Sequence, residues 1–319
     1  MTSFPPLRLR SKNEIAKRIS SPSFSQTQAL MLLNDVLKYF DAYWYDSKRS
    51  KKGKYVRSAA KSPNLRKLLR LINEKILAPH DFRVPDFIFG GLFERDNIQA
   101  AQHLLGGRDK IFLKMDIKSF FEQISEKRVF YFFFKHCQCT KEAATILSKL
   151  CCVPKGPRGS GETEKILARG FATSSRLAVW CNLNTFTYLQ LKVRSKLYRN
   201  DPRIAIYVDD IGIAAKGVNM ERMQKIKDFA VRILEKHDSN QPLPVHGNKT
   251  RIILFKDGAE YLGIKLGRNK LSLGAKTRSR YDKIKLALKS ADTAEKKKEL
   301  QEKYRAYSRY KRNVQTQVR

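Results

Sequence analysis

The sequence has no long hydrophobic run and no recognisable leader. None of its 319 residues lies in an apolar stretch long enough to cross a membrane, and residues 1–6 lack the pattern of a secretory signal. These absences favour a cytoplasmic protein without a membrane partner. No internal repeat is visible. At this length the chain can bury a sizeable core and hold two or three subdomains.

Motifs of two other protein classes are missing. The five cysteines form no Cys-x-x-Cys pair, and their apolar surroundings predict buried thiols rather than zinc ligands. They are Cys137, Cys139, Cys151, Cys152 and Cys181. A basic loop rich in glycine and proline at 153–161 lacks the Gly-Lys-Ser/Thr ending of a P-loop, which excludes that phosphate cradle.

Acidic residues are scarce beside basic ones. The chain has 65 Lys and Arg against 30 Asp and Glu, which gives a formal net charge of +35 and a pI near 10.1. Such an excess is too large for an ordinary solvated surface, and a polyphosphate is its natural partner. A membrane surface could attract the same charge, but the missing apolar runs argue against it.

Apolar periodicity predicts the local structure around the motifs. Helices are expected over most of residues 1–45, over 65–77, over 125–150 and over 223–234. A short strand is expected at 55–60, after a basic loop.

The most informative segment is the run from Tyr207 to Asp210. Apolar residues flank a Val-Asp-Asp tip on both sides, which predicts two strands that meet at a tight turn. Adjacent carboxylates at such a tip repel each other and lose hydration. A cation held between them relieves both costs, and hard oxygen ligands suit Mg²⁺. A solvated hairpin tip is the alternative interpretation.

A second carboxylate lies upstream in a similar setting. Residues 110–116 predict a strand that ends in Asp116, about ninety residues before the Asp-Asp tip. An aspartate at a strand end and a later Asp-Asp hairpin can together hold two metal ions. That arrangement serves in-line phosphoryl transfer, because one metal activates the attacking oxygen and the other stabilises the leaving oxygen.

These residues resemble the motifs of reverse transcriptases. Asp116 matches the motif A carboxylate, and Tyr207, Val208, Asp209 and Asp210 match the Tyr-x-Asp-Asp box of motif C. The resemblance implies RNA-templated DNA synthesis from dNTPs with two Mg²⁺ ions, for which Mn²⁺ could substitute. It implies metal binding at Asp116, Ile117, Asp209 and Asp210, and a place for Tyr207 in the substrate site.

The resemblance also implies the fold. We expect an α+β right-hand polymerase with an antiparallel-sheet palm, helical fingers and a short helical thumb. Residues 1–104 would form N-terminal helices and fingers, 105–265 the palm with insertions of the fingers, and 266–319 a basic helical thumb. No RNase H, integrase or endonuclease region is expected.

Motif B is matched with three departures: Ala168 and Ser175 replace the usual prolines, and Arg169, the chief departure, replaces a Gln. In the segment 167–175, Gly170 and Ser174 match the usual Leu-Pro-Gln-Gly-x-x-x-Ser-Pro pattern, and Gly170 would let the backbone approach the nucleotide or template closely. Arg169 replaces the Gln that lies near the incoming nucleotide. This added positive charge raises the alternative of a polymerase that works without a conventional template.

Four further residues are assigned by the resemblance, each with an ordinary alternative. Lys54 and Arg57 would bind the triphosphate, or they belong to a solvated basic loop. Phe121 would exclude a 2′-hydroxyl, or it is core like Phe120. Lys249, in a segment like motif D, would donate a proton to departing pyrophosphate, or it is one more phosphate-facing lysine. The segment 260–264 resembles the motif E primer grip.

The basic C-terminal region completes the pattern. Residues 276–319 would form one or two thumb helices against a duplex, with lysines on phosphates and interleaved tyrosines that stack or bond to sugars. The tyrosines are Tyr281, Tyr304, Tyr307 and Tyr310. The last ten residues are expected to be a solvated helix or a frayed tail.

The biological setting is implied by one more segment. Residues 97–104 resemble a stretch before motif A in bacterial retron-like reverse transcriptases, with Ala100 and His103 matching and Gln99 where Asn is usual. The partners implied are a dedicated noncoding RNA as template and primer, the DNA product, and a defence protein or a second copy of the chain in anti-phage defence. A catalytically idle nucleic-acid-binding scaffold is the alternative from a different class.

Overall fold

The computed structural model describes residues 4–49, 55–106 and 110–316. In these ranges the chain is a mixture of helices and antiparallel sheet, as expected for an α+β protein. The main sheet has four antiparallel strands in the order β6-β7-β3-β8. They are β3 (Lys110–Asp116), β6 (Arg203–Tyr207), β7 (Asp210–Lys216) and β8 (Arg251–Leu254).

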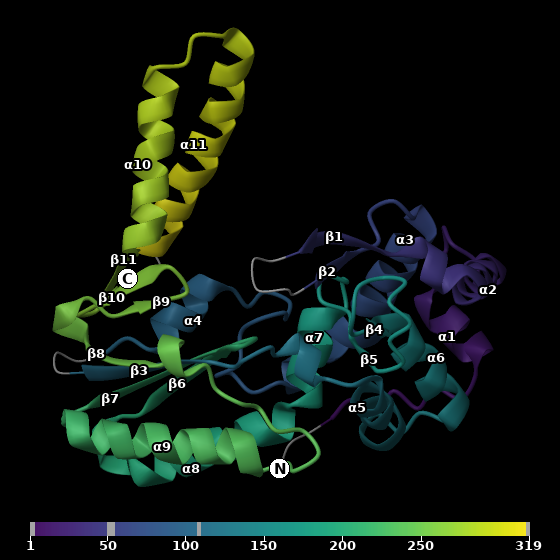
Figure 1. The fold of residues 1–319 in the computed structure, drawn as a ribbon, viewed down its shortest axis with the longest axis horizontal. Coiled ribbons are helices and arrows are strands. Elements are labelled where there is room, and N and C mark those ends of the chain that lie inside the picture. Colours follow the sequence, from purple (N-terminus) through teal and green to yellow (C-terminus); the bar gives the residue numbers. More distant parts are fainter. Residues whose placement is uncertain (1–3, 50–54, 107–109, 317–319) are drawn as a thin grey trace.

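Helices cover both faces of this sheet (Figure 1). The long helices α8 (Leu183–Lys196) and α9 (Met220–Lys236) run side by side along one face. The short helix α4 (Asn97–His103) lies on the other face against β6. Because β3 is central and paired on both sides, all but one of its side chains are buried, as its apolar run predicts.

The other half of the molecule is mainly helical and lies to the right in Figure 1. Its helices are α1 (Lys12–Ile19), α2 (Gln26–Tyr43), α3 (Pro63–Leu71), α5 (Glu126–Tyr131), α6 (Lys141–Cys151) and α7 (Ser174–Cys181). This half also contains two small antiparallel ribbons. One pairs β1 (Tyr45–Arg49) with β2 (Tyr55–Ser58), and the other pairs β4 (Cys152–Pro154) with β5 (Lys165–Leu167).

Two predicted helices differ from the structure. The single helix expected over 125–150 is wrong, because α5 passes into a π-helical turn at Phe132–His136 and the chain then breaks before α6. Gln138 has a left-handed φ of 57°, and the Thr140 side chain caps α6. The helix expected over 65–77 begins as α3 but continues as a π-helical turn at Ile72–Leu77 and a 3₁₀ turn at Ala78–Arg83.

The prediction of buried free thiols is confirmed. All five cysteines are buried and unpaired in disulfides. Burial raises the pKa of the Cys151 and Cys181 thiols to about 12. Within the described residues no group of three or more His, Cys, Asp or Glu side chains is arranged to hold a metal ion, so the cysteines form no zinc site there.

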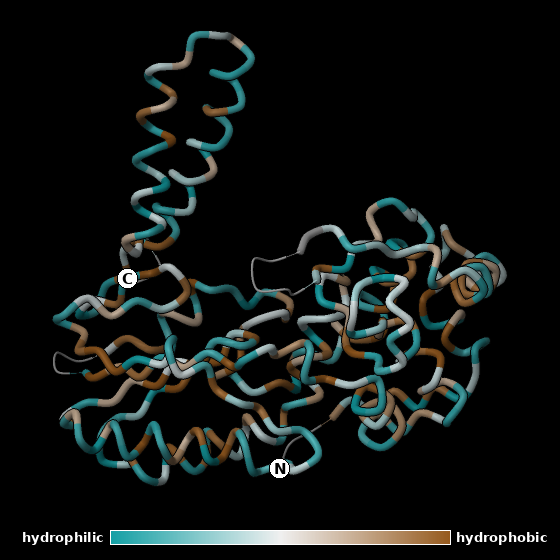
Figure 2. The backbone as a smooth tube through the Cα atoms, viewed as in Figure 1, coloured by the Kyte–Doolittle hydropathy of each residue, from teal (hydrophilic) through white to brown (hydrophobic). Residues whose placement is uncertain are grey.

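A helical hairpin projects from the sheet end of the molecule. A small sheet of β9 (Glu260–Tyr261), β10 (Ile264–Gly267) and β11 (Lys270–Leu273) leads into α10 (Ala275–Lys289) and α11 (Ala294–Thr316). Figure 1 shows the two helices side by side above this sheet, and Figure 2 shows that most of their residues are hydrophilic. In the described part of the chain, no helix has the length and apolar character needed to cross a membrane.

The tyrosines of the hairpin contact the protein itself. The rings of Tyr281 and Tyr304 stack with centroids 5.5 Å apart, which joins α10 to α11. The Tyr310 hydroxyl accepts a hydrogen bond of 2.7 Å from the side chain of Asn97, and Val314 is fully buried. Residues 311–316 continue α11 as a mostly exposed helix, as the prediction of a solvated helix has it, but Tyr310 and Val314 pack back onto α4 and the small sheet.

Candidate active site

Three carboxylates meet at one end of the four-stranded sheet. Asp116 ends β3 and is the direct cross-strand partner of Asp210, the first residue of β7. Tyr207 and Asp210 close the β6–β7 hairpin around Val208 and Asp209, and the Ile117 amide donates to the Asp209 carbonyl at 2.9 Å. The predicted strand–turn–strand and the predicted strand ending in Asp116 are both confirmed.

The hairpin turn is held by a neighbouring segment. Val208 has a left-handed φ of 57°, which is costly for a β-branched residue and needs support from its surroundings. Residues 87–89 lie parallel to β6, with backbone hydrogen bonds of 2.8 Å in both directions to Ile206. Gly90 follows, and a Cβ there would lie 2.5 Å from the Val208 side chain. Only a glycine lets this segment press against the turn.

The charges of Asp209 and Asp210 are only partly compensated. Burial raises the pKa of the Asp209 carboxyl, and the charge of Asp116 raises it further. Burial also raises the pKa of Asp210, although Lys114, with its Nζ 3.6 Å from Asp210 Oδ1, opposes that shift. The Nζ of Lys249 lies 2.6 and 2.7 Å from the two oxygens of Asp116.

The three carboxylates suit divalent cations by donor type, although among the described residues they are not arranged to hold an ion. Carboxylate oxygens are hard ligands, and a cation would relieve the burial and mutual repulsion that raise the pKa values of Asp209 and Asp210. At Asp116 the ammonium of Lys249 supplies the compensating positive charge. The Ile117 side chain is a hydrocarbon with no ligand atom, so only its main-chain carbonyl could bind a metal ion.

Tyr261 is a supporting residue that sequence reasoning did not assign. It is fully buried, and its hydroxyl donates to the carbonyl oxygens of Ala205 at 3.1 Å and Asp210 at 2.9 Å. These bonds tie β9 to the hairpin that carries the carboxylates. The motif-like segment 260–264 marked the region, but no local signal shows that its tyrosine reaches a strand some fifty residues away in sequence.

Arg57 is buried within the protein. Its guanidinium pairs with Asp46 and donates to the carbonyls of Pro154 at 2.9 Å and Gly156 at 2.5 Å. It therefore joins the β1–β2 ribbon to the loop after β4. Its predicted contact with a triphosphate stays a prediction. Lys54, assigned the same role, lies outside the described residues.

Gly170 and Ser174 also make contacts within the chain. Gly170 has a φ of +107°, and a Cβ there would lie 2.4 Å from the Arg57 carbonyl, so the close approach that it permits is to β2. The Ser174 side chain is buried and donates to the Ala168 carbonyl at 2.5 Å. Direct contact of either residue with substrate stays a prediction.

Arg169 and Phe121 lie together beside the carboxylates. The Arg169 guanidinium is 5.7 Å from the centre of the Phe121 ring and 3.7 Å from Glu122 Oε1. The charge of Arg169 partly opposes the rise in the pKa of the Asp209 carboxyl that burial and Asp116 cause. Phe120 is core, as expected for one of the two rings, whereas Phe121 is only half-buried.

A cavity of about 320 Å³ opens at this place. It is lined by residues of β2, of the segment that follows Asp116, and of β5 with the residues just after it. Arg169 and Glu122 are among these residues. Tyr207 is half-buried near the carboxylates, and burial raises the pKa of its hydroxyl. The three aspartates therefore lie at one site together with two basic side chains, Lys249 and Arg169.

An antiparallel sheet that presents paired aspartates beside basic side chains is typical of enzymes that transfer nucleotidyl groups. Comparison with protein families finds a match over residues 49–266 to the family described as reverse transcriptase (RNA-dependent DNA polymerase). The match spans more than half of the chain, which belongs to this family and is an RNA-directed DNA polymerase with the right-hand polymerase fold. The family implies a nucleic-acid template and dNTP substrates, and its members generally use divalent metal ions. Comparison with curated proteins finds no match.

Proposed function

We propose that the chain copies a dedicated RNA into DNA at the site formed by Asp116, Asp209 and Asp210. The observation that carries this proposal is the cross-strand pairing of Asp116 with Asp210 at the end that also bears Asp209. These three residues would hold two Mg²⁺ ions, or Mn²⁺ in their place. When bound, the ions supply positive charge at the attacking and leaving oxygens of the phosphoryl transfer.

Lys249 has two roles in this proposal. In the structure its ammonium neutralises Asp116, with contacts to both carboxylate oxygens. Because its side chain is about half exposed, it can turn away from Asp116 when another cation takes that place. Its Nζ would then carry the proton that the departing pyrophosphate needs.

The parts of the hand are assigned from the arrangement of the elements. We assign the N-terminal helices and the β1–β2 ribbon to the fingers, the four-stranded sheet to the palm, and α10 with α11 to the thumb. The division at 104/105 falls between α4 and β3, whereas the division at 265/266 falls inside β10. The thumb helices begin at Ala275, where the Ala275 amide donates to Glu260 at 2.6 Å.

The RNA partner is proposed from charge. The net charge of +35 suits a long polyphosphate partner, and α10 and α11 supply a basic surface for it. A dedicated noncoding RNA and a role in bacterial anti-phage defence fit the retron-like segment before Asp116. A partner defence protein or self-association would accompany that role.

Sugar selection gives the first prediction. Phe121 is half-buried beside Arg169, where a ring could lie against the sugar of a nucleotide. Phe121→Ala should raise the use of ribonucleotides relative to deoxynucleotides by about tenfold, since one lost steric contact of ~1.4 kcal/mol changes a rate ratio by that factor. The measurement is the incorporation ratio of matched NTP and dNTP pairs.

The control is Phe134→Ala, which truncates a half-buried ring that stacks on Phe130 in the helical half. It should leave the ratio unchanged. An unchanged ratio in folded Phe121→Ala would remove Phe121 from the sugar site and leave the deoxynucleotide preference without a steric cause.

Arg169 supports a second candidate function, DNA synthesis without a conventional template. Its charge reaches Asp209, and both Glu122 oxygens are buried without a hydrogen-bond donor among the described residues. An arginine in this place can donate two parallel, charge-assisted hydrogen bonds to a guanine edge or a phosphate. The usual Gln is neutral and cannot do so. The protein itself could then select the nucleotide.

Arg169→Gln is therefore expected to change which dNTPs are used, or the dependence on template, more than it changes the melting temperature. Because the Arg169 side chain is partly exposed, its ion pair with Glu122 contributes little to stability. The measurement is a four-dNTP incorporation profile with a melting curve for each protein. An identical profile would make Arg169 a bystander and would favour conventional templated synthesis.

One experiment separates the proposed functions. Purified protein is incubated with Mg²⁺ and labelled dNTPs, with and without prior RNase treatment. Loss of incorporation after RNase supports synthesis on RNA. Incorporation that resists RNase and every nuclease pretreatment supports synthesis without a template. No incorporation under either condition, with or without added primer and template, favours the idle scaffold.

A further inference from the structure

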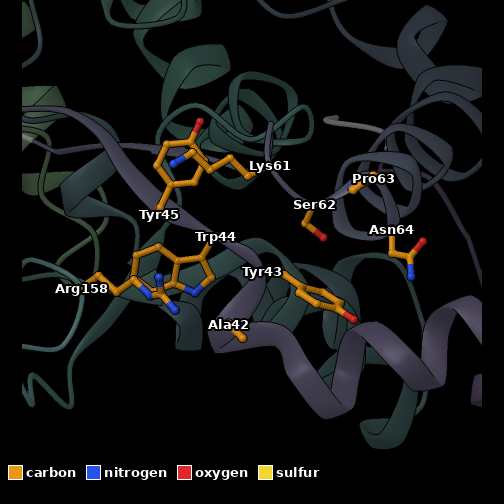
Figure 3. Close-up of a pocket in the computed structure, with 9 residues that line it drawn as sticks. All are labelled: Ala42, Tyr43, Trp44, Tyr45, Lys61, Ser62, Pro63, Asn64 and Arg158. Carbon is orange, nitrogen blue, oxygen red and sulfur yellow. The ribbon is translucent and has the colours of Figure 1, made fainter.

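A second cavity lies in the helical half. It has a volume of about 490 Å³, within the range of small-ligand sites. The end of α2, the start of β1, the start of α3 and the loop after β4 line it, and Figure 3 shows its side chains. We call it the Trp44 cavity. Its lining residues are Ala42, Tyr43, Trp44, Tyr45, Lys61, Ser62, Pro63, Asn64 and Arg158.

Aromatic rings and cations alternate around this cavity. The Lys61 ammonium lies 5.0 Å from the centre of the Tyr45 ring, and the Arg158 guanidinium lies 5.8 Å from the Trp44 ring. Both cations are on exposed residues, so they can reach a ligand in the cavity. Flat rings stack on planar groups, and paired cations attract phosphate, so the walls suit a ligand that has both.

The indole of Trp44 offers an unused donor in this wall. The residue is only 2 % exposed, and its Nε1 has no acceptor within hydrogen-bonding distance among the residues that the structure describes. A buried N–H without an acceptor is costly and uncommon in a native protein. A ligand that brings a carbonyl or ring-nitrogen acceptor would remove this cost. Nucleobases carry such acceptors at their edges.

The remaining walls add to the attraction for an anion. Ser62 caps α3 and Pro63 is its first residue, so the positive end of a nine-residue helix opens at the cavity. One carboxylate on α2, Asp35, accepts hydrogen bonds from the Tyr43 hydroxyl and the Asn64 side chain. Asp46 likewise forms an ion pair with Arg57 and accepts a hydrogen bond from the Arg158 amide.

We propose that the Trp44 cavity binds one unpaired nucleotide, with its base against Trp44 and Tyr45 and its phosphate beside Lys61 and Arg158. The nucleotide is either free in solution or one unpaired residue of a nucleic-acid strand. The acidic side chains of a peptide carry no aromatic ring to stack on Trp44 and Tyr45, so an acidic peptide fits less of the site. The proposal does not depend on catalysis at Asp116, Asp209 and Asp210.

The cavity is connected to the cavity at Arg169 through one side chain. The Arg57 guanidinium lies 5.3 Å from the Trp44 ring centre and 4.9 Å from the Tyr55 ring centre. Tyr55 and Arg57 line the cavity that contains Arg169. The guanidinium of Arg57 would therefore lie between a strand held at Trp44 and the cavity that contains Arg169.

Intrinsic fluorescence tests the proposal at the site itself. The chain has two tryptophans, and Trp180 is fully buried among Phe4 and Phe132, so Trp44 is the one that a ligand in the cavity reaches. The probes are the four nucleoside 5′-monophosphates, ribose 5-phosphate, an eight-nucleotide single-stranded RNA and its duplex. No metal ion or dNTP is added, so the result is independent of polymerase activity.

The proposal predicts saturable quenching by the single-stranded RNA and weaker saturable quenching by the monophosphates, but none by ribose 5-phosphate or the duplex. If only the RNA quenches the fluorescence, the site binds an unpaired residue of a strand. If the monophosphates bind with an affinity equal to that of the RNA or higher, the site binds a free nucleotide. Equal quenching by ribose 5-phosphate, or no saturable quenching by any probe, overturns the proposal.

Two exposed cations provide variants that leave the fold intact. Lys61→Gln with Arg158→Gln should weaken the single-strand binding seen by fluorescence about fivefold or more, and should reduce the slope against log salt by ~1.4. Lys67→Gln removes one exposed charge from α3 outside the cavity. It should change the affinity for the single strand and the slope against log salt only as much as the loss of any one surface charge does. Trp44→Phe should abolish the quenching signal. Equal affinities for the double variant and Lys67→Gln would overturn the proposal.

Discussion

Asp209→Asn should reduce nucleotide incorporation by about three orders of magnitude or more. Asp209 lies at the tip of the β6–β7 hairpin beside Asp116 and Asp210, and a neutral amide in its place weakens the capture of cations without removing bulk. Cations at such a centre contribute several kcal/mol to the barrier, and each ~1.4 kcal/mol is a factor of ten in rate. The measurement is incorporation of labelled dNTPs on a primed RNA template.

The fold should survive this change. Because burial raises the folded-state pKa of Asp209, its ionised form opposes folding, and that cost grows as pH rises through the raised pKa. Asn cannot ionise, so without divalent cations the variant should melt at the same temperature as the wild type or above it near pH 7. Asp228→Asn, an exposed change on α9, is the matched control and should leave incorporation intact. Wild-type incorporation by Asp209→Asn would contradict the catalytic assignment.

Asp81→Ala should destabilise the protein by about 3–5 kcal/mol, because it leaves a buried guanidinium without its partner. Asp81 accepts two hydrogen bonds of 2.8 Å from Arg176 in α7, and a third of 2.7 Å from the Phe93 amide. Both side chains are less than one-tenth exposed. In a protein of this size the melting temperature should fall by roughly 5–10 °C.

Asp86→Ala is the control for this prediction. Asp86 is an exposed carboxylate in the same connection, and its loss should shift the melting temperature by little. Since the connection also carries Gly90, which presses on Val208, Asp81→Ala should lower incorporation even below its melting temperature. A melting curve like that of Asp86→Ala would show that the Asp81–Arg176 pair does not hold this segment.

The central site was predictable because its signals are local. An apolar run that ends in Asp116 specifies a strand with a carboxylate at its end, and the apolar flanks of Asp209 and Asp210 specify a hairpin. Their pairing across β3 and β7 joins residues about ninety positions apart, and only the resemblance to reverse transcriptases implied a common antiparallel sheet. The long helix α9 and the strand β2 were predicted for the same reason, since their patterns lie within a few residues.

The supports of the site were not predictable, because their partners are distant in sequence. Gly90 was visible as part of a Gly-Gly pair, but nothing local shows that Val208 presses on it. Arg57 was assigned to phosphate from its charge, whereas its guanidinium is taken up by Asp46 and two carbonyls. Tyr310 was placed against nucleic acid or solvent, whereas its hydroxyl meets Asn97, more than two hundred residues earlier.

Metal-directed cleavage tests the central claim, that Asp116, Asp209 and Asp210 together hold divalent cations. Fe²⁺ replaces Mg²⁺, ascorbate and peroxide generate hydroxyl radicals at the bound ion, and mass spectrometry locates the cuts in the chain. The account predicts cuts near residue 116 and within 207–210, which Mg²⁺ suppresses by competition and which Asp209→Asn loses. Cuts elsewhere only, or cuts at these places that persist unchanged in Asp209→Asn, would contradict it.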